Sequence, residues 1–358
     1  MGNFNDKTFI SINEAAQAIL AYGQNITPIL FGEPGIGKTS ILKEMQKVLG
    51  DEYDYIYVDC PVMDMSDIAM RVPNKDTGQL ELYVSSLFKL GNGRKKVILF
   101  DEFAKTPKLT QTIFTRALLE RCIGDKQIEA GSYLFGTSNL SSDGVGDAML
   151  AHGSSRVMKL YVSKSNAMQY LAWATENGQS PLLRAWVAMN PRSMASYLDD
   201  GQDDNPYIFN PKKKQDSYLC PRSYAKCDPI VRQRDKVGNK LTEAALAGTI
   251  GAAAAQSLAA FMSLEKELVA VKEIIRNPEG VPIPEKLAAL FMTMFNAVDT
   301  IETQDDLSAF MKYVNRVSSS ELQSVFFTML LQSKRTMRLA RNNGDVMNWA
   351  KDNYELLV

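Results

Sequence analysis

The stretch GEPGIGKT, Gly32 to Thr39, decides the fold of this chain of 358 residues. It fits the pattern G-x-x-x-x-G-K-[ST] and lies between an apolar run, residues 28–31, and a segment with helical periodicity, residues 41–49. A glycine-rich loop between a strand and a helix presents backbone N–H groups at the helix N-terminus, where they bind phosphate. The sequence therefore predicts a phosphate-binding loop in an α/β fold.

Individual positions of this loop have expected roles. Lys38 is expected to reach the β and γ phosphates of a nucleotide, and the Thr39 hydroxyl is expected to ligate Mg²⁺. The glycines allow a backbone path that a side chain would block. The predicted nucleotide contacts are Gly32, Glu33, Pro34, Gly35, Ile36, Gly37, Lys38, Thr39 and Ser40.

Two further strand ends carry polar side chains. VILFDEF, Val97 to Phe103, ends an apolar run in Asp101 and Glu102. After a phosphate-binding loop, Asp101 is expected to hold the magnesium ion and Glu102 to polarise the attacking water. LFGTSNL ends a later run at Asn139, whose amide is expected to orient the water and sense the γ phosphate.

Short apolar runs alternate with helical patterns up to Val162, which is typical of a parallel sheet covered by helices. We expect five strands, at residues 28–31, 55–60, 97–100, 133–137 and 157–162, and hairpins at residues 69–84 and 121–131. Helical patterns then dominate, interrupted by a polar loop at residues 199–224. The predicted fold is an αβα sandwich with a five-stranded parallel sheet, followed by an all-α region.

In this order the motifs resemble those of the AAA+ ATPases, and within them the MoxR-like and dynein-related group. The stretches that carry the resemblance are GEPGIGKT, VILFDEF, GTSNL, HGSSR (His152–Arg156) and CPRSY (Cys220–Tyr224). The resemblance implies a P-loop NTPase core with ATP and Mg²⁺ as cofactors at residues 1–162. It also implies a helical lid with a mobile loop at residues 163–240 and a helical extension at 241–358.

The resemblance also assigns two arginines. Arg156, just before the last expected strand, would be the arginine finger that reaches ATP bound to a neighbouring subunit; Arg116 and Arg121 are alternatives. Arg222 would be the sensor 2 arginine, with Arg192 in a second Pro-Arg-Ser stretch as its alternative. A homo-oligomeric ring, expected to be a hexamer, would then use ATP hydrolysis to remodel a protein partner, such as a von Willebrand A-domain protein.

Composition excludes several other classes. A net charge of −1 predicts no general attraction to nucleic acid or to a membrane surface. Four cysteines and one histidine fit no zinc pattern, and a first segment without a basic and apolar signal favours a cytoplasmic protein. Residues 241–264 are long and apolar enough to raise the question of a membrane span, but Glu243 and Gln256 favour a tightly packed buried helix.

Two other functions have some support in the sequence. His152 and Ser154 stand close together, but no G-x-S-x-G elbow accompanies them, so a serine hydrolase is disfavoured. Residues 212–240 hold nine Lys or Arg against three Asp, which leaves a nucleic-acid motor or loader as the alternative to a protein remodeller. We expect most of this basic run to be a solvated loop.

Overall fold

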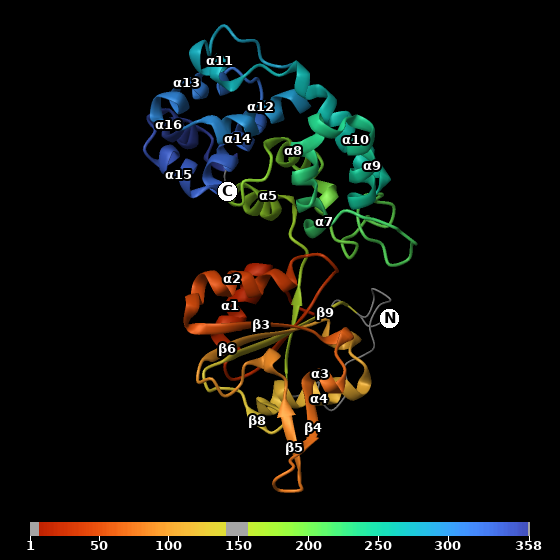
Figure 1. The fold of residues 1–358 in the computed structure, drawn as a ribbon. Coiled ribbons are helices and arrows are strands. Elements are labelled where there is room, and N and C mark those ends of the chain that lie inside the picture. Colours follow the sequence, from red (N-terminus) through yellow and green to blue (C-terminus); the bar gives the residue numbers. More distant parts are fainter. Residues whose placement is uncertain (1–6, 141–156, 357–358) are drawn as a thin grey trace. The chain divides into compact units, whose positions relative to one another are not determined.

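The computed structural model describes residues 7–140 and 157–356 (Figure 1). The chain divides into two compact units, Met1–Lys164 and Ser165–Val358. Each unit has hydrophobic clusters of its own, so each is described by itself.

The first unit is built on a parallel sheet of six strands in the order β1-β10-β2-β9-β6-β3. The strands are β1 (Phe9–Ile10), β2 (Pro28–Phe31), β3 (Tyr53–Asp59), β6 (Lys95–Asp101), β9 (Tyr133–Ser138) and β10 (Met158–Val162). All five predicted strands are present. The prediction of five strands is wrong by one, because β1 is only two residues long and shows no periodicity; it pairs with Tyr161 and Val162 at the edge.

Helices cover both faces of this sheet. Successive strand residues point to opposite faces, so Ile98 and Phe100 pack with Phe114 of α4 (Lys108–Glu120), while Leu99 packs with the other layer. That layer consists of α1 (Ile12–Tyr22) and α2 (Ile41–Leu49), which bury Ile19 and Met45. The predicted αβα sandwich is confirmed.

Both expected hairpins are present. The first pairs β4 (Ala69–Pro73) with β5 (Leu80–Val84) after the short helix α3 (Met65–Ile68), and the second pairs β7 (Cys122–Ile123) with β8 (Lys126–Gln127). The β4–β5 hairpin projects from the first unit (Figure 1). It leaves four large apolar side chains exposed: Met70, Val72, Leu80 and Tyr83.

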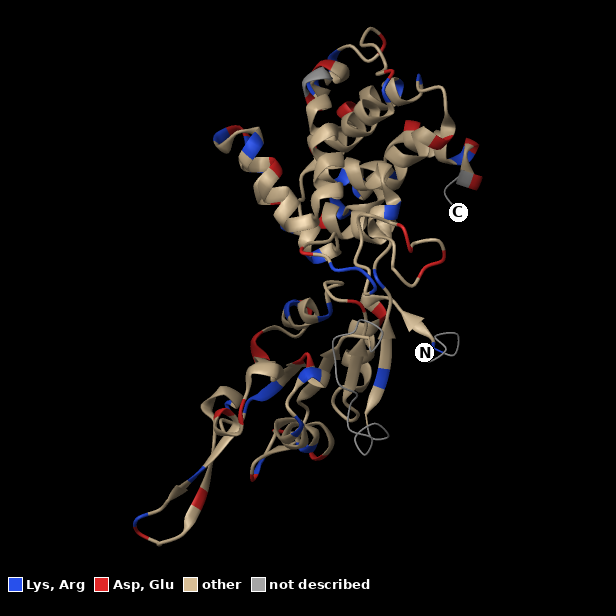
Figure 2. Ribbon diagram, turned by 90° about the vertical axis from the view of Figure 1, so that its right-hand side faces the viewer, with Lys and Arg blue, Asp and Glu red and all other residues tan. Residues whose placement is uncertain are grey.

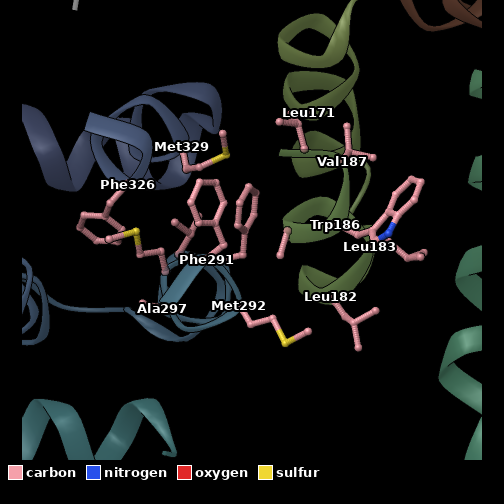
Figure 3. Close-up of a cluster of buried hydrophobic side chains, with 14 of the residues drawn as sticks. Leu171, Leu182, Leu183, Trp186, Val187, Phe291, Met292, Ala297, Phe326 and Met329 are labelled. Atoms are coloured by element: carbon pink, nitrogen blue, oxygen red, sulfur yellow. The ribbon is translucent and has the colours of Figure 1, made fainter. Parts of the chain in front are cut away.

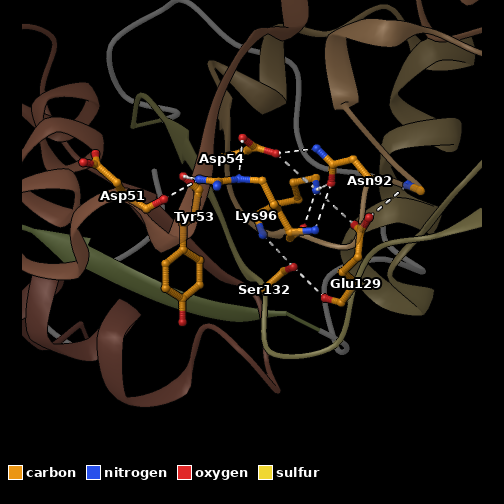
Figure 4. Close-up of polar contacts among 9 residues, drawn as sticks. Asp51, Tyr53, Asp54, Asn92, Lys96, Glu129 and Ser132 are labelled. Atoms are coloured by element: carbon orange, nitrogen blue, oxygen red, sulfur yellow. Dashed lines mark hydrogen bonds and ion pairs between the residues drawn. The ribbon is translucent and has the colours of Figure 1, made fainter.

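A buried ion-pair cluster joins the amino-terminal ends of β3 and β6. Lys96 is fully buried, and its Nζ lies 3.4 Å from both an Asp54 and a Glu129 carboxylate oxygen (Figure 4). Asn92 donates to Asp54 at 2.9 Å and accepts from Lys96 at 2.7 Å. The Asn92 hydrogen bond, followed by the Lys96 charge, holds the pKa of Asp54 below its ordinary value.

We expect Lys96→Met to lower the free energy of unfolding by about 3 to 5 kcal/mol, because it removes the buried cation from both carboxylates and leaves Asp54 with only the half-exposed Arg94, 3.3 Å away. Lys95→Met is the matched control, since Lys95 is exposed on the same strand and should change stability by about 0.5 kcal/mol or less. Urea unfolding at pH 7 measures both. Equal values for the two variants would contradict the role given to the cluster.

The same variant has a pH signature. Because the folded-state pKa of Asp54 is depressed, its stabilising contribution is present above the unfolded pKa and is lost as the pH falls through the folded value. The difference in the free energy of unfolding between Lys96→Met and the parent should therefore become smaller below about pH 4. If this difference in the free energy of unfolding stays constant down to the pH of acid unfolding, charge pairing is not what destabilises the variant.

Apart from an isolated bridge between Ile208 and Leu219 in a loop at residues 195–220, the regular structure in the described part of the second unit is helical. Its helices are α5 (Ala167–Glu176), α6 (Pro181–Met189), α7 (Pro221–Ala225), α8 (Cys227–Val237), α9 (Asn239–Ile250), α10 (Ala252–Ser263), α11 (Val271–Arg276), α12 (Leu287–Thr300), α13 (Gln304–Val314), α14 (Ser320–Gln332), α15 (Lys334–Arg341) and α16 (Gly344–Asp352). One buried cluster extends from Ala167 to Trp349 and contains Trp186 of α6 and Phe291 of α12 (Figure 3). The division of this unit at residue 240 stays a prediction.

The apolar segment 241–264 is not the single buried helix that the sequence predicts. Gly251 separates α9 from α10 with a φ of 85°, and a β-carbon there would lie 2.8 Å from the Ser217 carbonyl oxygen. An L-residue at this position would be strained and would clash, so glycine permits the break. Within residues 7–140 and 157–356, no helix is long and apolar enough to cross a membrane.

Candidate functional site

The predicted phosphate-binding loop connects β2 to α2. Lys38–Ser40 form a 3-10 turn that leads directly into α2, and Gly37 precedes it with φ 105° and ψ 11°. This left-handed conformation is open to glycine at little cost and disfavoured for other residues. The loop thus places the backbone of Gly37 and Lys38 at the start of the helix, the position at which N–H groups bind anions.

Lys38 and Asn139 lie together, although 101 residues separate them in the chain. The buried Nζ of Lys38 donates to the carbonyl oxygens of Gly32 at 2.6 Å and Glu33 at 2.8 Å, and to Oδ1 of Asn139 at 3.2 Å. Asn139 follows directly after β9, next to β2 in the sheet. The order of parallel strands therefore brings two of the predicted site residues together.

Asp101 is surrounded by hydroxyl groups. Thr39 Oγ1 donates to its carboxylate, 3.1 Å from Oδ1 and 3.2 Å from Oδ2. Tyr57 OH donates to Oδ2 at 3.0 Å, and Thr137 Oγ1 donates to Oδ1. Desolvation, and after it the Asp101 charge, raises the pKa of Tyr57, so its phenol stays a donor at neutral pH.

Glu102 lies beside this cluster in a strained backbone conformation. Its φ of 51° is in the left-handed region, which costs an ordinary residue roughly 1 kcal/mol or more and is frequent at functional sites. Its N–H donates to Thr137 Oγ1 at 3.1 Å, and its carboxylate forms an ion pair of 2.6 Å with Lys105. Thr137 thus joins both acidic residues.

Three residues of this site carried no signal in the sequence analysis: Thr137, Tyr57 and Lys105. Thr137 stands two residues before Asn139 on β9, so its position in the strand was the available clue. Tyr57 and Lys105 belong to none of the quoted motifs. Their contacts become visible only when the register of β3 against β6 and the turn after Glu102 are known.

The structure describes the two alternatives to the predicted arginine finger but not the finger itself. Arg156, His152 and Ser154 lie outside the described residues. Of the alternatives to Arg156, Arg121 donates to the backbone carbonyls of Ser132 and Gly23 inside its own unit, and the exposed Arg116 pairs with Glu120 at 2.6 Å. Both guanidinium groups are therefore already engaged within the first unit.

The two sensor 2 candidates lie in the second unit. Arg222 is exposed near the start of α7, and its guanidinium contacts no carboxylate in the described part of the chain. Arg192 donates to the Gly201 carbonyl at 3.3 Å. Among the described residues, Arg192 is thus the candidate whose guanidinium is bonded within the second unit.

The donor set fits magnesium rather than zinc. Thr39 and Asp101 offer hydroxyl and carboxylate oxygens, and Mg²⁺ commonly takes few protein ligands and completes its shell with water and phosphate oxygens. Among the described residues, no three His, Cys, Asp or Glu side chains form a metal cluster. All four cysteines are buried and free of disulfides.

A parallel sheet with a glycine-rich loop after its central strand β2, Thr39 on Asp101 and Lys38 on Asn139 define the first unit as a P-loop nucleoside triphosphatase. Residues 28–140 match the family model of the AAA domain, dynein-related subfamily, so this segment carries a dynein-related AAA domain. That domain supports ATP hydrolysis as the activity. No curated protein matches the chain.

Two solved structures are weakly similar to this chain. NtrX from Brucella abortus is 13% identical with a TM-score of 0.33, covering 72% of this chain and 69% of its own. A protein described as a "putative ATPase" from Cytophaga hutchinsonii is 15% identical with a TM-score of 0.30, covering 76% of this chain and 90% of its own. At such low scores these likenesses add nothing to the assignment, which stands on the family match and the site.

Proposed function

We propose that this chain is a Mg²⁺-dependent ATPase of the MoxR-like AAA+ group that forms a homo-oligomeric ring, expected to be a hexamer, and remodels a protein partner in the cytoplasm. The observation that carries the ATPase assignment is the convergence of three separate motifs. Nζ of Lys38 lies 3.2 Å from Oδ1 of Asn139, and Oγ1 of Thr39 lies 3.1 Å from Oδ1 of Asp101. Nucleotide binding needs all of these groups at one end of the sheet.

Each residue has a distinct task in this proposal. The backbone of the loop and Lys38 would bind the β and γ phosphates, while Thr39 and Asp101 would hold a magnesium ion that neutralises charge on the phosphate oxygens. Asn139 would orient the attacking water. Glu102 would accept its proton, and the 2.6 Å ion pair with Lys105 must open or be shared for it to do so.

Two features favour a protein partner over nucleic acid. The β4–β5 hairpin exposes four large apolar side chains, which suits contact with protein, and the resemblance suggests a von Willebrand A-domain protein. In the basic run, Lys212, Arg232 and Arg234 pair with Asp203, Asp228 and Glu265. The ribbon in Figure 2 shows acidic residues interspersed with basic ones along the second unit. A motor that binds nucleic acid through this run is therefore the weaker alternative.

We expect Lys38→Ala to weaken ATP binding by about 30-fold or more, because removing a charged partner of buried phosphates costs about 2 to 5 kcal/mol and each 1.4 kcal/mol is tenfold. Lys43→Ala, an exposed lysine of α2, is the matched control and should bind like the parent. Fluorescence titration with an ATP analogue measures both, and thermal melting checks that each variant is folded. Parental affinity in Lys38→Ala would refute the proposed site.

A further inference from the structure

Tyr57 is an aromatic residue of β3 that reaches the acidic residue at the end of the neighbouring strand. In the parallel register Tyr57 lies opposite Leu99, and Asp59 lies opposite Asp101. Residues two apart on a strand share a face and are about 6.6 Å apart, a step that the length of a phenol side chain covers. Its hydroxyl accordingly donates to Oδ2 of Asp101 at 3.0 Å.

The hydrogen bonds to Asp101 are divided between its two oxygens. Thr137 donates to Oδ1 and Tyr57 to Oδ2, whereas Thr39 lies within reach of both oxygens. A hydroxyl carries a single proton, so Thr39 serves one oxygen at a time. Without Tyr57, the shared Thr39 hydroxyl would be the only one of these donors left for Oδ2, and the carboxylate would be held less firmly about its terminal torsion.

We propose that Tyr57 is a positioning residue that fixes the Asp101 carboxylate in the orientation that receives the divalent cation. The proposal rests on the proposed function, because it needs a magnesium nucleotide at Asp101. Tyr57 would not touch the nucleotide or the metal. Mutation of a residue that orients a metal-ligating carboxylate typically lowers the metal affinity about 10- to 100-fold.

The Tyr57 side chain contributes little to the packing of the first unit. Tyr57 is 44% exposed, so its ring contributes little to the core, and within residues 7–140 and 157–356 its hydroxyl has Asp101 as its only hydrogen-bond partner. Tyr55, two residues earlier on the same face of β3, also has a bonded hydroxyl, but it donates to the Gly50 carbonyl at 2.7 Å. The strand thus carries two comparable tyrosines: the hydroxyl of Tyr57 donates to the Asp101 carboxylate, and that of Tyr55 donates to a backbone carbonyl.

The test compares Tyr57→Phe with Tyr55→Phe in the full-length chain. Binding of a fluorescent ATP analogue is measured with EDTA and then at increasing free Mg²⁺, and repeated with Mn²⁺. Tyr57→Phe should keep the parent's metal-free affinity and melting temperature while the half-saturating Mg²⁺ concentration rises about tenfold. Tyr55→Phe should match the parent in all three measurements.

Several outcomes would overturn the inference. An unchanged or lower Mg²⁺ requirement in Tyr57→Phe would show that its hydroxyl does not position Asp101. An equal rise in Tyr55→Phe, or an equal loss of metal-free affinity, would indicate a general effect on the strand. Lys38→Ala in the same assay separates the two proposals: if it binds like the parent, the proposed nucleotide site itself fails.

Discussion

Glu102→Gln is expected to bind ATP in the presence of Mg²⁺ with near-parental affinity and to hydrolyse it at least about a hundredfold more slowly. General base catalysis typically contributes about 10²- to 10⁴-fold, and an amide cannot accept the proton of the attacking water. The side chains have the same shape, so the left-handed turn at φ 51° and the Thr137 contact should persist. Single-turnover hydrolysis and nucleotide titration separate the two effects.

Glu120→Gln is the control for this variant. Glu120 lies at the end of α4, is exposed, and pairs with Arg116, so its neutralisation should leave hydrolysis near the parental rate. The lost ion pair between residue 102 and Lys105 should cost little stability, because such half-exposed pairs are worth about 0 to 1 kcal/mol. Hydrolysis at the parental rate by Glu102→Gln would remove Glu102 from the catalytic role.

The site residues that could be predicted from the sequence are those that belong to short motifs. Lys38 and Thr39 stand in one loop whose glycine pattern implies its backbone shape, and Asp101 and Asn139 each end an apolar run. Parallel strands bring their carboxyl ends to one edge, so the contacts of Lys38 with Asn139 and of Thr39 with Asp101 follow from strand order.

The residues that escaped prediction depend on register or on local geometry. Tyr57 meets Asp101 because β3 pairs with β6 in one particular register, which periodicity does not encode. Lys105 meets Glu102 because a tight turn follows a residue with positive φ. The helix break at Gly251 was missed because a lone glycine within an alanine-rich run is compatible with a continuous helix.

Arg156→Ala is expected to bind ATP normally and to hydrolyse it about 10³- to 10⁵-fold more slowly, the range by which an arginine supplied to a phosphoryl-transfer site changes the rate. In the proposed ring, this arginine would act on a neighbouring subunit. Arg156 precedes β10 by two residues, and the first residue of β10, Met158, lies opposite Pro28 at the start of β2. Lys38 follows the other end of β2, so the chain enters β10 at the edge of the sheet opposite its own phosphate-binding loop.

Mixing inactive variants tests this arrangement directly. Arg156→Ala combined with Lys38→Ala should regain part of the activity, because some interfaces then pair an intact Lys38 with an intact Arg156 from the next copy. His152→Ala and Ser154→Ala are the controls and should stay within a few-fold of the parent, whereas Arg121→Ala should lose stability rather than catalysis, since Arg121 supports the Ser132 carbonyl. If mixed rings form without any recovery, or if His152→Ala is the variant that abolishes hydrolysis, Arg156 is not the residue that completes the neighbouring site.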